Sequence, residues 1–174
     1  MSNGLSTRKL LTAFAIFVAV IVGTFMFLVA VMFSSLEPTT IDESDADYLE
    51  LQRFFRHAPT ELMQSHLLEG SWTGDVEKAF AVRVVGMDTE LLWQQQGVVR
   101  GDRLTPELEY AVDFIGNLLD SGYVPWFPTL EEIRRDSHYV YPVMIVTQGS
   151  YPDSAQMIVM RPFDDMAFFA FLKY

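Results

Sequence analysis

The amino-acid sequence predicts an α+β protein, with one N-terminal transmembrane helix followed by a small domain of packed helices and an antiparallel sheet of about five strands. Three observations lead to this prediction. A long uncharged apolar stretch lies near the N-terminus, a Val-rich alternating segment lies in the middle, and three strand-like runs separated by turn sequences come last. Helices and strands that follow one another without regular βαβ alternation are typical of this fold class.

The apolar stretch contains no charged residue from Leu10 to Leu36. It exceeds the roughly 20 helical residues that cross the hydrocarbon core of a bilayer. It is also too long for the apolar region of a secretory signal peptide, and no small-x-small cleavage site follows it. We therefore expect an uncleaved transmembrane helix over 10–36, preceded by a short cytoplasmic N-terminus at 1–9.

Flanking charge predicts the orientation of this helix. Arg8 and Lys9 precede it, whereas all 23 acidic residues follow Leu36. Because positive charge stays on the cytoplasmic side, we expect a single-pass protein of the bacterial inner membrane. An acidic linker over 37–47 would then lead to a periplasmic α+β domain over 48–174.

Side-chain size is unevenly distributed around the predicted helix. At 100° per residue, bulky residues such as Phe14 and Phe25 fall on one face. The opposite face carries the small residues Thr12, Ala15, Ala19, Gly23 and Ala30. Small residues spaced four apart allow two helices to approach closely, so we interpret this face as a helix-docking surface. The alternative is that Ala and Gly are simply common in such helices, and that the segment is only a tether.

The first half of the domain is predicted from local patterns. Helices are expected over 48–56 and 61–69, the second capped by Thr60 and ended by Gly70. The alternating Val-rich segment 78–87 predicts a strand. A turn at 86–89 followed by 91–99 then predicts a second strand and a hairpin.

Clearer signals mark the second half. Thr105 and Pro106 are typical of a helix start, apolar residues then recur at the helical period, and Gly122 ends the pattern. Thr129 and Glu132 have the spacing of a capping box. Strands are predicted over 139–148, 154–162 and 166–174. The last is apolar on both faces, as expected for a strand inside a sheet that is covered on both sides.

Composition excludes several kinds of chemistry. The absence of cysteine excludes disulfides, thiolate nucleophiles, iron–sulfur clusters and Cys-based zinc sites. The net charge of −11 argues against nucleic-acid binding, although acidity also simply favours solubility. His57, His66 and His138 lack metal-binding spacing. Without a catalytic motif, we expect no cofactor, no metal and no enzymatic activity, with a dispersed active site as the alternative.

The loop YVPWFP provides a candidate contact surface. Tyr123, Trp126 and Phe127 lie among prolines, where secondary structure does not require apolar bulk. They are predicted to contact a partner or the membrane interface. The alternative is that the loop folds back and buries its rings.

These features lead to one functional hypothesis and one alternative. The hypothesis is a non-catalytic accessory subunit of an inner-membrane complex, such as a respiratory or photosynthetic electron-transport complex. Its expected partners are the membrane and other transmembrane subunits, or a second copy of itself, and not nucleic acid. The alternative is a membrane-anchored periplasmic ligand-binding or sensor module.

Overall fold

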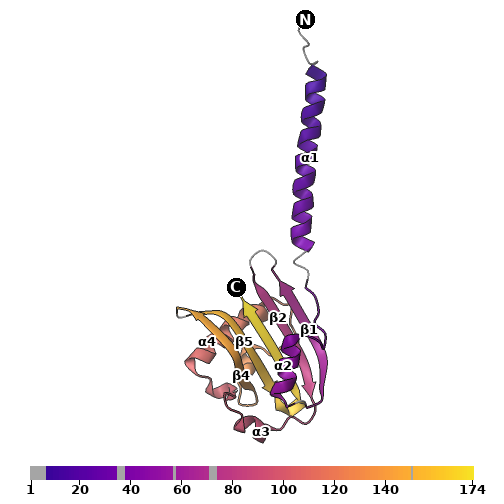
Figure 1. Cartoon of the computed structure of the whole chain (residues 1–174). Coiled ribbons are helices and arrows are strands. Elements are labelled where there is room, and N and C mark those ends of the chain that lie inside the picture. Colours follow the sequence, from indigo (N-terminus) through magenta and orange to yellow (C-terminus); the bar gives the residue numbers. More distant parts are fainter. Residues whose placement is uncertain (1–6, 35–37, 57, 71–73, 150) are drawn as a thin grey trace. The chain divides into compact units, whose positions relative to one another are not determined.

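A computed structural model describes residues 7–34, 38–56, 58–70, 74–149 and 151–174 (Figure 1). The chain divides into two compact units, residues 1–37 and 38–174. Helix α1 (Thr7–Ser34) belongs to the first unit. Its side chains are described at residues 11, 12 and 14–30. A mixed domain of helices and strands forms the second unit.

No helix in the described parts of the chain combines the length and the apolar character that a membrane span requires. On this finding the prediction of a transmembrane helix over 10–36 is wrong. The predictions of a single-pass, inner-membrane, periplasmic subunit of an electron-transport complex depended on that helix and are wrong with it.

The second unit is built on a six-stranded sheet in the order β1-β2-β6-β5-β4-β3, in which every neighbouring pair is antiparallel. The last strand along the chain therefore lies inside the sheet, between β2 and β5 (Figure 1). The strands are β1 (Thr60–Glu69), β2 (Val76–Val84), β3 (Val99–Arg100), β4 (Tyr139–Gln148), β5 (Tyr151–Arg161) and β6 (Met166–Lys173).

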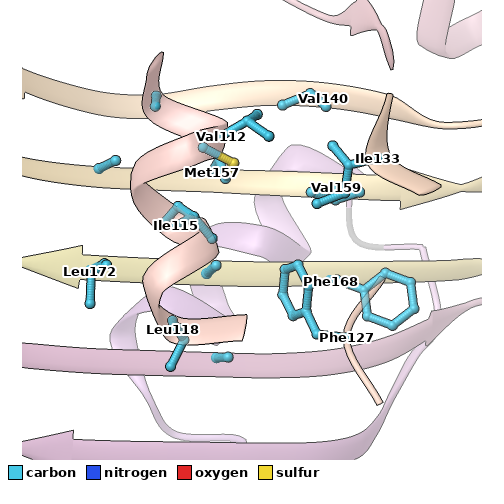
Figure 2. Packing of buried hydrophobic residues seen from close by; sticks show 14 of the residues in the cluster. Val112, Ile115, Leu118, Phe127, Ile133, Val140, Met157, Val159, Phe168 and Leu172 are labelled. Carbon is cyan, nitrogen blue, oxygen red and sulfur yellow. The ribbon is translucent and has the colours of Figure 1, made fainter. Parts of the chain in front are cut away.

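Each face of the sheet has its own apolar core. Helix α4 (Pro106–Asp120) packs on one face, where Val112, Ile115 and Leu118 point toward residues of β5 and β6 (Figure 2). Helix α2 (Ala46–Phe54) covers the other face through Tyr48 and Leu51. The shorter elements are α3 (Thr89–Gln94), α5 (Leu130–Ile133) and two 3₁₀ turns, η1 (Gly101–Arg103) and η2 (Pro162–Asp164).

Several sequence predictions are confirmed in the second half of the domain. The Thr105 side chain accepts a hydrogen bond from the backbone N–H of Leu108, and Pro106 opens α4. Thr129 and Glu132 form the predicted capping box of α5. The strand predicted to be buried on both faces is β6, with Phe168 in one core and Phe169 in the other. Strong local signals thus coincide with the observed elements.

The first half of the domain differs from the prediction. Residues 61–69 form strand β1, not a helix, because pairing with β2 overrides the helix preference of residues such as Leu, Glu and Gln. Residues 91–99 do not form one strand, since the Asp88 side chain caps α3 and β3 begins only at Val99. The hairpin partner of β2 is therefore β1. The sheet has six strands and not about five.

A buried cation fastens α2 to the sheet. Lys78 on β2 is 8 % exposed, and its Nζ donates to Asp45 Oδ1 at 2.7 Å and to Asp47 Oδ2. Asp45 also caps α2 by accepting from backbone N–H groups. Gln156 on β5 donates to Asp47 Oδ1 at 3.0 Å. Burial alone would lower the pKa of Lys78, but hydrogen bonds and charge from the two aspartates outweigh it and raise the pKa.

Replacing this cation tests its contribution to stability. We expect Lys78→Met to lower the free energy of unfolding by about 3 kcal/mol, because two partly buried carboxylates would lose their counter-charge. Arg83→Met is the matched control, since Arg83 is exposed and pairs with Glu61 at 3.6 Å. It should cost less than about 1 kcal/mol. Urea unfolding of both variants measures the difference, and equal losses would contradict the role of Lys78.

Candidate functional site

Helix α1 carries the predicted docking face. The described side chains of both faces are exposed, among them those of Phe14, Phe17 and Phe25. All five predicted docking residues, Thr12, Ala15, Ala19, Gly23 and Ala30, are exposed as well. A Cβ added at Gly23 would meet no atom within 4 Å. Docking at this face stays a prediction.

The aromatic loop folds largely onto the domain. Phe127 is buried in the core beneath α4 and lies 5.5 Å from the ring of Phe168 (Figure 2). Trp126 is half-buried and packs against the same core. Tyr123 is exposed and stacks on the ring of His66. Of the three predicted contact residues, only Tyr123 presents its ring mainly to solvent.

The stacking partner of Tyr123 belongs to a buried titratable pair. His66 on β1 is 5 % exposed, and its Nε2 lies 3.9 Å from Oε2 of Glu77 on β2. Both atoms are buried and lack a hydrogen-bond partner within the described residues. Sequence analysis considered His66 for metal binding and did not single out Glu77. His66 and Glu77 lie close together because β1 pairs with β2. The sequence predicted a helix over 61–69, so this pairing was not expected.

Burial shifts both groups toward their neutral forms. It lowers the pKa of His66, because the imidazolium would lose water. It also raises the pKa of Glu77, with a smaller contribution in the same direction from Asp75. At 3.9 Å, His66 Nε2 and Glu77 Oε2 are too far apart to share a hydrogen bond.

The other histidines do not extend this pair. The ring of His138 lies 6.4 Å from that of Phe163, edge to face, and burial followed by the charge of Arg161 lowers the pKa of His138. His57 lies outside the described residues. Within the described parts of the chain, no group of three or more His, Asp or Glu side chains is placed to hold a metal ion.

A small, mainly apolar hollow lies between the end of α2, α3 and the sheet. The hollow has a volume of about 130 Å³ and is lined mainly by apolar side chains such as Phe55, Met87 and Leu92. Gln95 also lines it, and its Nε2 donates to the carbonyl of Phe54 at 3.3 Å. That bond orients the amide, and leaves Gln95 Oε1 buried without a hydrogen-bond partner among the described residues.

Comparisons with protein-family models, curated proteins and solved structures find nothing that matches this chain. Function is therefore inferred from the exposed helix, the buried pair and the hollow, without a family as support. The first of these is an exposed apolar surface, and the last is a small hollow of about 130 Å³.

The buried pair predicts a pH-dependent stability. The unfolded chain binds a proton on His66 at about pH 6.5. The folded protein does so only at lower pH, so its stability should fall as pH drops below about 6.5 until the lowered pKa is reached. Glu77 acts in the opposite sense, since its stability contribution falls as pH rises through its raised pKa.

We expect His66→Gln to flatten the stability profile between about pH 6.5 and 5, measured by urea unfolding at successive pH values. The slope that remains would combine His138, whose pKa is also lowered, with the opposite contribution of Glu77, whose pKa is raised. His138→Gln should remove the His138 part separately. Parallel profiles for wild type and His66→Gln would contradict the assignment.

Proposed function

We propose that this protein is a non-catalytic binding protein that packs α1 against helices of a partner protein. The observation that carries the proposal is the exposure of apolar side chains around α1, with Phe14, Phe17 and Phe27 each more than 60 % exposed. A helix that is apolar on all sides is normally buried against other apolar elements. An exposed apolar surface of this extent marks an interaction site.

The small face of α1 supports close packing with a second helix. Side chains at Ala15, Ala19 and Gly23 end at or before Cβ, so another backbone can come near along this side. The space around Gly23 is open to a partner. The acidic residues of the domain 38–174 would favour the solubility of the assembly.

Substitution at Gly23 tests the docking face. We expect Gly23→Leu to weaken assembly at least about tenfold, because overpacking a close contact costs about 1–3 kcal/mol. The helix itself should not suffer, since Leu has a higher helix propensity than Gly. The measurement is native gel separation of tagged full-length chain, extracted from its own cells in mild detergent, with helicity followed by circular dichroism.

Ile21→Phe is the matched control, because it adds bulk to the opposite face of α1. It should leave the size of the assembly unchanged. Migration of the wild-type chain alone, at its own 19.9 kDa plus detergent, would refute the proposal. An unaltered assembly in Gly23→Leu would instead show that this face does not make the contact.

A second candidate function is the binding of a small ligand in the domain. It is favoured by the hollow beside α3, which is lined mainly by apolar side chains. A dry apolar cavity of about 150 Å³ accommodates a benzene ring, so a volume of about 130 Å³ suits a single-ring or short aliphatic molecule. Such a ligand would be held by apolar contacts with the lining.

Phenol provides a single-ring probe of this size. We expect saturating phenol to raise the melting temperature of the full-length protein by about 3 °C. Ala58→Leu, which places bulk in the hollow, should abolish the effect. If phenol stabilises wild type and Ala58→Leu equally, phenol does not bind in this hollow.

A further inference from the structure

We propose that the outer edge of β4 binds an extended segment of a partner protein as an additional strand, with a Lys or Arg side chain of that segment facing Glu107. This surface lies in the domain 38–174. The inference therefore goes beyond the role proposed for α1 and does not depend on it.

Most of the outer edge of β4 is unpaired. Strand β3 pairs with β4 only at Val99–Val140 and Arg100–Tyr139. From residue 141 to 148, β4 pairs on one side only, with β5 (Figure 1). Apart from these ladders, the backbone of 141–148 makes no hydrogen bond with another backbone group among the described residues. Such an edge presents free N–H and C=O groups to an incoming strand.

The edge carries no charge that would oppose pairing. No charged residue occurs from Tyr139 to Gln148, and the apolar side chains of Met144 and Val146 are exposed. The opposite edge of the sheet differs, because β1 carries Glu61 and exchanges two backbone hydrogen bonds with Thr39. Native proteins blunt edges with charge, Pro, β-bulges or a covering segment. Over this length β4 has Pro142 and register shifts with β5 at Pro142/Met144 and at Val146/Thr147, but it has no charge and, among the described residues, no covering strand.

A groove follows this edge where β3 stops. Gly97, with φ of +89°, directs the chain away from the line that a longer β3 would take. The space beside it is a hollow of about 390 Å³, lined by Gly97, Val99, Thr105, Glu107, Leu108 and residues 142–145. A second hollow of about 300 Å³ is lined by Glu107, Tyr110, Thr147 and Pro152. An extended segment would thus lie between β4 and the first turns of α4.

The backbone of β4 limits where pairing can occur. Pro142 has no N–H, and the register with β5 shifts between Pro142 and Met144. Pairing with a new strand is therefore confined to residues 143–147. That length supports a short additional strand, whose alternate side chains would enter the two hollows.

The carboxylate of Glu107 favours a positively charged segment in this groove. Glu107 borders both hollows and makes no ion pair within the described residues, whereas neighbouring Glu109 is paired with Arg134 at 3.0 Å. A cation of the incoming segment would therefore meet an unpaired carboxylate. A second copy of this chain would bring its own Glu107 and a net charge of −11 to the contact, so like-charge repulsion disfavours it. The fitting partner is a basic, apolar, extended segment.

A peptide library tests the proposal on the full-length protein in mild detergent. The probes are acetylated eight-residue peptides in which Val, Ile or Thr alternates with Lys, Arg or Ser. We expect the best binders to contain Lys or Arg and to shift the amide NMR signals of residues 143–147. In a control peptide, four consecutive backbone amide nitrogens at the centre are methylated. The peptide keeps its charge but loses the N–H donors on both of its edges, so it should not bind.

Two charge reversals separate this site from general attraction to an acidic protein. Glu107→Lys should weaken binding at least about tenfold, which corresponds to about 1.4 kcal/mol. Glu61→Lys makes the same change on β1, at the other edge of the sheet, and should alter the affinity less than about twofold.

Four results would overturn the proposal. The first two are that no peptide in the library binds, or that the methylated peptide binds as well as the unmethylated one. The other two are that the NMR signals shift on β1 and not on β4, or that Glu107→Lys and Glu61→Lys change the affinity equally. Sedimentation that reveals a dimer formed through β4 would replace the partner segment by a second copy. None of these outcomes bears on Gly23, so failure here leaves the role of α1 to be judged separately.

Discussion

The fold depends on the burial of β6 on both of its faces. Phe168, Ala170 and Leu172 point into the core under α4, while Ala167 and Phe169 point into the core under α2. A strand with no solvent-facing side requires a covering layer on each side of the sheet. Phe169 also stacks on Phe80 of the neighbouring strand at 4.6 Å. Helix α4 covers one face of β6 and helix α2 covers the other. The ion pairs of Lys78 hold the start of α2 on its face of the sheet.

Local chemistry explains why part of the fold was predictable from sequence. The start of α4 requires only Thr105 and Pro106, and the capping box of α5 requires only Thr129 and Glu132. Each signal lies within a few residues of the structure it specifies. Residues 61–69 lack such a signal. Their helix-forming side chains become a strand because Ala79 and its neighbours on β2 pair with them, and a pairing partner cannot be recognised from local preference alone.

The candidate sites were less predictable for the same reason. Glu77 approaches His66 through strand pairing, and Gln95 reaches its hollow from the end of a helix that sequence analysis took for a strand. The free edge of β4 depends on the strand order, which no single segment encodes. The aromatic loop could be located, but whether Phe127 faced outward or inward depended on the core residue Phe168. The membrane prediction relied on composition, and the described part of α1 does not meet the requirement for a span.

The place of β6 in the sheet also constrains the order in which the domain can fold. It follows the other five strands along the chain, yet it is the one that joins β2 to β5. Before β6 is synthesised, the β1–β2 hairpin and the β3–β4–β5 ladder share no backbone hydrogen bonds through the sheet. If these two ladders form in a growing chain, that chain holds two partial sheets, each with an unpaired inner edge. The sheet closes only when β6 pairs with both, and until then other chains can contact the two inner edges.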